Sequence, residues 1–472
     1  MILILLRYVL PSDVLGKNEG GKQMKRWWLS AGMCVVGLVG LLVISGANEA
    51  QASVEDLLYE KGQITKEEWL KLKAEHEKEE AAAKEPSPIK KWFDKVSIRG
   101  YTQLRYTYLP GDKNKDSLRS EYDSTIGNNT GFGLRRARLV ISGDVTDWLS
   151  FYVQPEFAGV VPGTTSDGNN NFVQLRDAYA DIYLPVPLLF LGEKDLRIRA
   201  GLSKIPFGFE NLQSSQNRLA LDRSDGLNSA VNGERDLGYF LYYTPAETRK
   251  LFKKLVDSGL KGSGDYGVLG VGVYNGQTIN VAERNNNKHV VVHATYPLEL
   301  PYGQIIQFGV DAYRGTFNVG STSLTSITKE NNGNILDERV GVHFILYPQP
   351  IGFQAEWNWG HGPQLNAART RVEEGNVQGG YVQAMYKWDV NQPLLTSVIP
   401  YVRYQEYGGG KKHRTNAPYN VVREWEIGTE WQFTRSLEFT IAYAKSRRTD
   451  TQNAPYPIRE ADIVRTQLQW NF

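Results

Sequence analysis

The chain has 472 residues, enough for two or three soluble domains, and 22% of its residues are charged. Past residue 52 no apolar run reaches the ~18 residues that a membrane-spanning helix needs, which excludes a helical membrane protein. Lys and Arg number 54 against 52 Asp and Glu, so the strongly basic surface typical of nucleic-acid-binding proteins is absent.

Residues 1–52 have the pattern of an export signal. Met24-Lys25-Arg26 is a charged start, residues 29–45 are an apolar core, and Ala50-Gln51-Ala52 is a small-x-small cleavage site. We expect translation to start at Met24 and cleavage to follow Ala52. The only cysteine, Cys34, lies in the apolar core and would be removed with it. The mature chain would then have no disulfide and would need another source of stability, which a closed, hydrogen-bonded barrel supplies.

Residues 53–92 are predicted to form a periplasmic helical segment and a linker. The segment is rich in Glu, Lys and Ala, and Thr65 with Glu68 makes a capping box at the start of its longer helix. Pro86-Ser87-Pro88 ends this helix. Its apolar positions are few, so a solvated periplasmic helix is the simpler interpretation and a coiled-coil trimer stalk is the alternative.

From residue 93 to the end, apolar and polar residues alternate as they do on strands. At the C-terminus Val464, Thr466, Leu468, Trp470 and Phe472 lie on one side, and Arg465, Gln467, Gln469 and Asn471 on the other. One side suits lipid and the other suits water, as in a strand of an outer-membrane barrel. A soluble β-sandwich also alternates, but its strands are shorter and each sheet needs a polar outer face.

The same alternation predicts sixteen strands along residues 93–472. They lie near 96–109, 131–145, 149–160, 172–184, 196–204, 235–244, 266–275, 288–297, 304–317, 337–348, 351–361, 377–388, 397–407, 420–434, 437–448 and 463–472. Short and long connections alternate between them, which predicts an antiparallel transmembrane β-barrel with short periplasmic turns and long extracellular loops. The connection 244–265 breaks this rule because it holds a basic helical stretch, 247–256. Either a periplasmic helix is inserted there or the strand count slips locally.

Strand parity also predicts which charged side chains line the interior. The arginines at inward positions are Arg99, Arg105, Arg136, Arg138, Arg197, Arg199, Arg403 and Arg465. The acids at inward positions are Glu156, Asp177, Asp181, Glu356, Glu424, Glu426, Glu430 and Glu438. Two interpretations follow. Paired wall charges would create a transverse field with little charge selectivity, whereas an arginine ladder would favour anions.

Several sequence blocks resemble the phosphate-selective porin O and P family of outer-membrane channels. They are FGLRRARLVISGDVTDWLSFYVQPEF (132–157), QLRDAYADIYL (174–184), RIRAGLSKIPFGFE (197–210), GERDLGYFLYY (233–243) and, at the periplasmic lead-in, LLYEKGQITKEEW (57–69). The resemblance implies sixteen strands, a homotrimer, and a third extracellular loop that folds into the pore. Lys204, Arg218 and Arg223 would then line the constriction.

These observations together predict a porin in the outer membrane of a Gram-negative-type bacterium, surrounded by outer-membrane lipid. It would pass small hydrophilic solutes by passive diffusion, with phosphate or other anions as the candidate preferred solutes. The chain has no paired cysteines and neither a G-x-S-x-G nor a P-loop motif, so we expect no catalytic site, metal or cofactor. The alternative function is a barrel without a channel, acting as a structural sheath or conduit for an electron-transfer partner.

Overall fold

The computed structural model describes residues 58–59, 61–84, 95–110, 118–120, 126, 130–158, 173–184, 192–320 and 326–472. The expected export signal, 1–52, lies outside these residues. The chain divides into two compact units, 1–87 and 88–472. None of the helices in the described ranges combines the length and the apolar character needed to cross a bilayer.

In the first unit, helix α4 (Lys66–Lys84) begins at the predicted capping box. The Thr65 N–H donates to Glu68 Oε2 at 2.8 Å, and the Glu68 N–H donates to Thr65 Oγ1 at 3.3 Å. These two bonds satisfy backbone donors that the helix start leaves without partners. Tyr59 stacks on Trp69 with ring centroids 5.3 Å apart, which fixes the chain before the helix.

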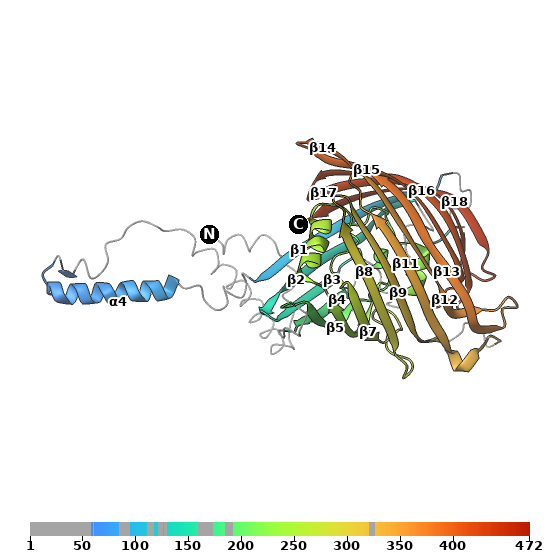
Figure 1. The fold of residues 1–472 in the computed structure, drawn as a ribbon, viewed down its shortest axis with the longest axis horizontal. Helices are drawn as coiled ribbons and strands as arrows, with labels where there is room; N and C mark the ends of the chain where they lie inside the picture. The colour runs from blue at the N-terminus through green and yellow to red at the C-terminus, as the bar shows by residue number, and fades with distance from the viewer. Residues whose placement is uncertain are drawn as a thin grey trace, which may run out of the picture. The chain divides into compact units, whose positions relative to one another are not determined.

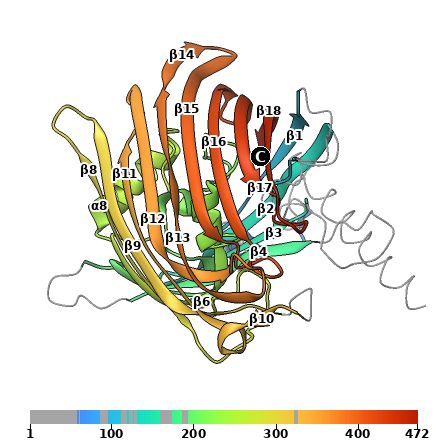
Figure 2. The ribbon, with the colours of Figure 1, turned by 90° about the vertical axis from the view of Figure 1, so that its right-hand side faces the viewer.

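The second unit is a barrel of sixteen long strands with two short additions, β10 and β14 (Figures 1 and 2). The long strands are β1 (Val96–Tyr108), β2 (Gly131–Thr146), β3 (Leu149–Glu156), β4 (Gln174–Tyr183), β5 (Leu196–Lys204), β6 (Arg235–Tyr243), β7 (Leu269–Tyr274), β8 (His289–Glu299), β9 (Ile305–Asn318), β11 (Asn334–Leu346), β12 (Ile351–Leu365), β13 (Arg371–Tyr386), β15 (Leu395–Gly410), β16 (Tyr419–Thr434), β17 (Leu437–Thr449) and β18 (Ile458–Asn471). The short elements of this unit are β10 (Thr328–Lys329), β14 (Trp388–Gln392), α6 (Phe209–Leu212), α7 (Asp225–Ala230), α8 (Ala246–Asp257) and η1 (Glu330–Gly333).

Hydrogen bonds between the first and last strands close the barrel. β1 pairs antiparallel with β18 from Tyr101 opposite Asn471 to Tyr108 opposite Val464. Each long strand also pairs antiparallel with its neighbours around the ring, and β14 continues β13 along β15. Closure leaves no free sheet edge, so backbone groups at membrane depth have partners. The predicted sixteen-stranded antiparallel barrel is confirmed.

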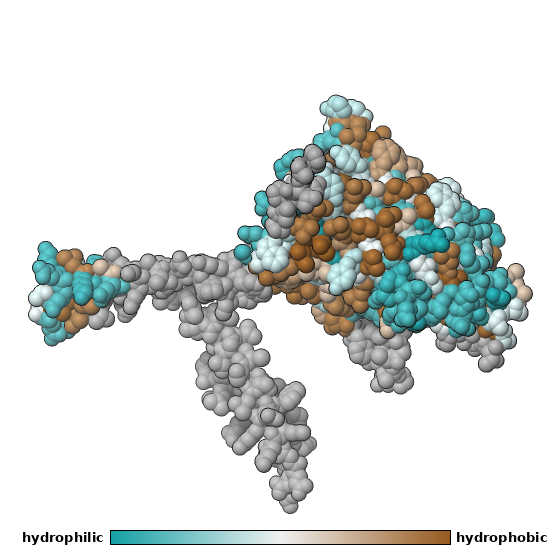
Figure 3. All heavy atoms as spheres, turned by 60° about the horizontal axis from the view of Figure 1, so that its bottom comes forward, coloured by the Kyte–Doolittle hydropathy of each residue, from teal (hydrophilic) through white to brown (hydrophobic). Residues whose placement is uncertain are grey.

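The outer face carries the apolar side of each strand. Phe132, Tyr239 and Trp425 expose 77%, 71% and 59% of their surface, whereas alternate residues on the same strands are buried. Figure 3 shows a broad hydrophobic area on the barrel wall beside a hydrophilic area. Such a surface is stable against lipid and unstable against water.

The two rims of the barrel differ in their connections. The terminal rim, where β1 begins and β18 ends, has tight turns such as 147–148, 347–350 and 435–436. The opposite rim, here the loop rim, carries the long connections. At the terminal rim α8 is inserted between β6 and β7, which still pair directly with each other. The connection 244–265 therefore contains an inserted helix, which was the first of the two predicted alternatives, and the strand count does not slip.

Candidate functional site

Loop L3, residues 205–234, connects β5 to β6 and lies inside the barrel (Figure 2). Its Phe207 is fully buried and packs edge-on against Tyr313 of β9, with ring centroids 5.0 Å apart. The backbone N–H of Gly208 donates to Asp311 Oδ2 on β9 at 2.9 Å. Gly208 has φ +84°, and a Cβ there would overlap Leu227, so glycine suits this turn. These contacts hold L3 against the inner wall.

A buried carboxylate at the start of α6 fixes the shape of L3. Glu210 pairs with Arg403 of β15 at 2.7 Å and accepts the Ser224 N–H at 2.8 Å. The Glu210 N–H in turn donates to Glu356 Oε2 of β12 at 3.0 Å. Glu210 thus joins two parts of L3 to β15 through its side chain and to β12 through its backbone. The pair with Arg403 satisfies two charges that would be costly to bury unpaired.

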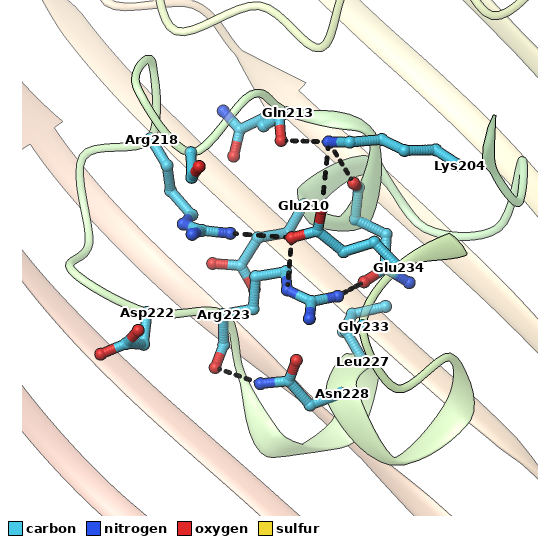
Figure 4. Close-up of polar contacts among 12 residues, drawn as sticks. Lys204, Glu210, Gln213, Arg218, Asp222, Arg223, Leu227, Asn228, Gly233 and Glu234 are labelled. Carbon is cyan, nitrogen blue, oxygen red and sulfur yellow. Dashed lines mark hydrogen bonds and ion pairs between the residues drawn. The ribbon is translucent and has the colours of Figure 1, made fainter. Parts of the chain in front are cut away.

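Glu234, at the end of L3, collects four basic groups, of which Figure 4 labels Lys204, Arg218 and Arg223. Its carboxylate lies 3.0 Å from Arg223 Nε, 3.5 Å from Lys204 Nζ and 4.0 Å from Arg218 Nη1, and it also pairs with Arg235. Burial alone would raise the pKa of Glu234, but these cations hold that pKa well below its usual value. Burial lowers the pKa of Arg223 to about 10. Glu234 therefore stays ionised at neutral pH.

Lys204 is the last residue of β5 rather than part of the loop. Its ammonium donates to the carbonyl oxygens of Asn211, Leu212 and Gln213 at 2.8, 3.2 and 2.6 Å. These carbonyls surround the end of α6, where the helix leaves acceptors without partners. Lys204 therefore shapes L3 as well as carrying charge.

Asp222, midway along L3, collects four arginines of the barrel wall. Its carboxylate lies 2.6 Å from Arg105 Nη1, 3.0 Å from Arg135 Nη2, 3.0 Å from Arg465 Nη1 and 3.7 Å from Arg136 Nη2. Burial favours the protonated acid, but Arg105, Arg135, Arg465 and Arg136 together hold the pKa of Asp222 well below its usual value. β1, β2 and β18 are thus connected through one loop side chain.

All eight predicted arginines occupy inward positions, and most of them pair with acids of the wall, of L3 or of the connection between β6 and β7. Arg138 pairs with Glu156, Arg199 with Asp181 at 2.8 Å, and Arg197 with Asp265 at 3.2 Å. Arg105, Arg136 and Arg465 reach Asp222, and Arg403 reaches Glu210. Arg99 donates to the Tyr152 hydroxyl at 3.5 Å. The structure thus brings Arg105, Arg136 and Arg465 together at Asp222, and Arg403 lies on β15 opposite Glu426, the residue of β16 that also pairs with Arg465.

The alternation of inward and outward residues did not predict two basic residues of this site, Arg135 and Arg235. Arg135 belongs by alternation to the outer face, but the β1–β2 register shifts between Gln103 and Leu104. The bulge turns Arg135 toward Asp222 beside Arg136. Arg235, at the first position of β6, pairs with Asp177 at 2.9 Å. The adjacent arginines in LRRAR were the only sequence signal for the bulge.

Two cavities lie on either side of L3. The inner chamber, about 540 Å³, is lined by Arg99, Arg138, Tyr179, Arg199, Ser214, Asn217 and Tyr266 among others. The outer cavity is only about 20 Å³ and is lined by Asp222, Glu424, Glu426, Arg448 and Arg465 among others. Arg138 lines the inner chamber, and Arg136, two positions earlier on β2, reaches Asp222. The Asp222 cluster therefore lies where the two cavities approach each other.

The connection 244–268, here the strap, enters the barrel from the terminal rim. Lys261 Nζ pairs with Glu430 of β16 at 2.6 Å, and both side chains are buried. Gln213 of L3 donates to the Lys261 carbonyl at 2.6 Å. Leu255 and Leu260 pack in one cluster with Phe209 of L3. The strap therefore contacts L3 and the β16 wall, and it forms the floor of the inner chamber.

Replacing Lys261 by methionine should release the strap from β16. Removing one partner of a buried ion pair typically costs ~3–5 kcal/mol, because Glu430 would remain as an unpaired buried charge. We expect a higher single-channel conductance in planar bilayers. Lys253→Met is the matched control, because Lys253 and its partner Asp257 are exposed on the same strap. Equal conductance in the two variants would show that the strap does not narrow the lumen.

Comparisons with known proteins were made for the whole chain. A family model described as phosphate-selective porin O and P matches residues 114–472. No curated protein matches the chain. Similar solved structures include the outer membrane channel DcaP of Acinetobacter baumannii (12% identity, TM-score 0.46, covering 80% of this chain and 97% of that one) and Salmonella typhi OmpF (14%, 0.48, 80% and 97%). Another is an anion-selective porin from Comamonas acidovorans (11%, 0.46, 80% and 99%).

Proposed function

The chain belongs to the phosphate-selective porin O and P family, and from this membership we propose that its lumen passes small hydrophilic anions in preference to cations. The protein is an outer-membrane channel for passive diffusion. Its terminal rim therefore faces the periplasm and its loop rim faces the outside, as in bacterial barrels whose two ends are periplasmic. We assign no catalytic role to the chain.

The observation that carries the anion preference is the excess of basic groups around L3. Asp222 and Glu234 together contact eight basic side chains, four each. Two further carboxylates share these cations, because Arg465 also pairs with Glu426 and Arg235 with Asp177. Eight positive groups thus face four negative ones. In a narrow lumen with low-dielectric walls, such an excess attracts anions and repels cations.

Elsewhere in the lumen several charges are paired, which limits the preference. Arg138 with Glu156, Arg199 with Asp181, and Lys261 with Glu430 are pairs of opposite charge. We therefore propose that both interpretations of the wall charges apply, in different places. Paired charges line the wall, and the excess is local to L3, where Arg105, Arg136, Arg465, Lys204, Arg218 and Arg223 lie.

The direct test is the reversal potential of the purified channel in a planar bilayer with a KCl gradient. We expect a potential that favours chloride over potassium, and a smaller preference at high salt because mobile ions screen the L3 charges. A reversal potential that favours potassium would contradict the proposed function. The same apparatus reports conductance, so closed or misfolded protein is recognised separately.

We also propose how the chain is processed, organised and assembled. We propose that residues 1–52 are removed after Ala52, that 53–92 form a periplasmic helical segment and linker, and that 93–472 form the membrane-embedded channel. We also propose a homotrimer surrounded by outer-membrane lipid. The family membership and the apolar outer face of the barrel support these assignments.

A further inference from the structure

We propose that Asp222 is a tethered counter-anion, which occupies a binding site for small solute oxyanions. The site consists of Arg105, Arg135, Arg136 and Arg465, here the arginine cage. The inference rests on the proposed anion preference and adds to it where an anion would bind and which residue competes for that place.

The arginine cage is held in shape by groups other than Asp222. Arg105 donates from Nη2 to the Leu221 carbonyl at 2.9 Å and to Gln467 Oε1 at 2.7 Å. Arg136 Nη1 donates to Gln103 Oε1 at 2.7 Å. Arg465 also pairs with Glu426. The guanidinium groups of Arg105, Arg136 and Arg465 would therefore remain converged if the Asp222 carboxylate moved away, and a preorganised site binds without the cost of assembling itself.

The chemistry of the cage defines the ligand class. A carboxylate already fits among the four guanidinium groups, at N–O distances from 2.6 to 3.7 Å. Arginine offers a planar fork of donors that matches carboxylate and phosphate oxygens. The cage carries four positive charges against the two of Asp222 and Glu426, so an oxyanion with one or two charges in place of the Asp222 carboxylate would compensate it at least as well. Chloride, which is spherical, would use these directed donors less well.

Arg218 of L3 adds buried donors and positive charge to the region around the arginine cage. The side chain of Arg218 is buried with 2% exposure, and its Nε, Nη1 and Nη2 atoms have no hydrogen-bond partner within the described part of the chain. Within the described residues, Arg218 forms an ion pair with Glu234 at 4.0 Å. Arg218 also interacts electrostatically with Asp222 and Arg135. Buried guanidinium donors without acceptors are costly, and the positive charge of Arg218 adds to the attraction of the arginine cage for an oxyanion.

Asp222 is suited to exchange because it lies on a loop and not on a strand. It occupies the stretch between α6 and α7, its side chain is 12% exposed, and it lines the outer cavity. A solute oxyanion that enters from the loop rim therefore meets Asp222 beside the cage. While tethered, the carboxylate competes with the solute at a high effective concentration. Weak net binding suits a channel, because a solute must also leave.

The test compares block of the chloride current by inorganic phosphate in the wild-type channel and in Asp222→Asn, both as the full chain in planar bilayers. The variant keeps a side chain of the same size but removes the competing charge. We expect the half-blocking phosphate concentration to fall by at least about tenfold. Acetate, which matches the Asp222 carboxylate, should also block the variant at lower concentration, whereas Asp222→Glu should resemble the wild type.

Asp225→Asn is the matched control, because its carboxylate lies 3.6 Å from Arg448 and outside the arginine cage. An unchanged half-blocking concentration in Asp222→Asn, or an equal fall in both variants, would overturn the tether. Asp222→Ser provides a second removal of the charge, and failure of both variants to assemble would also count against a replaceable carboxylate. The wild-type reversal potential separates the two proposals. If the wild-type reversal potential favours chloride while the half-blocking phosphate concentration of Asp222→Asn equals that of the wild type, the proposed anion preference stands and only the role of Asp222 as a tethered counter-anion is contradicted.

Discussion

Gly226→Val is expected to displace L3 from the barrel wall and to raise the single-channel conductance well above that of the wild type. An added Cβ at Gly226 would lie 2.6 Å from the carbonyl carbon of Gly379 and 2.7 Å from the N atom of Gly380. Both are backbone atoms of β13, which hydrogen bonds hold on both sides. The overlap cannot be relieved by a rotamer change, so α7 must move. Overpacking of this kind typically costs ~1–3 kcal/mol.

The control for Gly226→Val is Gly131→Val at the start of β2. No atom lies within 4 Å of a Cβ at Gly131, so the same substitution should leave conductance unchanged there. Heat-dependent gel mobility in detergent should show that both variants form a folded barrel. Wild-type conductance in a folded Gly226→Val channel would mean that L3 does not limit the flow of ions.

The strands could be predicted from the sequence because lipid and water impose a period of two on every strand. The alternation at Val464, Leu468 and Trp470 predicts the face of β18 that the structure exposes. The ends of strands are less determined, since polar residues beyond the membrane fit a strand as well as a loop. β18 therefore begins at Ile458, where the alternation predicted 463.

The candidate site could be predicted only in part. Parity indicates that Arg105 and Arg465 face inward, but their shared partner Asp222 is on a loop more than a hundred residues from either. No local pattern specifies such a pairing. Arg135 was lost because one bulge reverses the parity of the residues beyond it. The strap was visible as an irregular connection, but its contact between Lys261 and Glu430 depends on the closed barrel.

Arg136→Ala with Arg138→Ala is expected to lower the permeability ratio of chloride to potassium by at least about tenfold, since even one unit charge at 8 Å contributes roughly 2 kcal/mol at an effective dielectric constant near 20. Arg136 lies 3.7 Å from Asp222, and Arg138 pairs with Glu156 and donates to the Tyr101 hydroxyl at 2.9 Å. The double variant removes two positive charges and leaves Glu156 uncompensated. The reversal potential in a KCl gradient measures the ratio.

Two further variants distinguish a local charge effect from damage to the barrel. Arg314→Ala with Arg447→Ala removes two arginines whose partners, Glu338 and Glu460, lie on the outer face, and it should leave the ratio unchanged. Adding Glu156→Gln to the inner double variant should recover part of the chloride preference, because it removes the uncompensated carboxylate. A wild-type ratio in the inner double variant would mean that Arg136 and Arg138 only balance wall acids. The other basic groups around L3, among them Arg105, Arg218 and Arg465, would then have to set any preference.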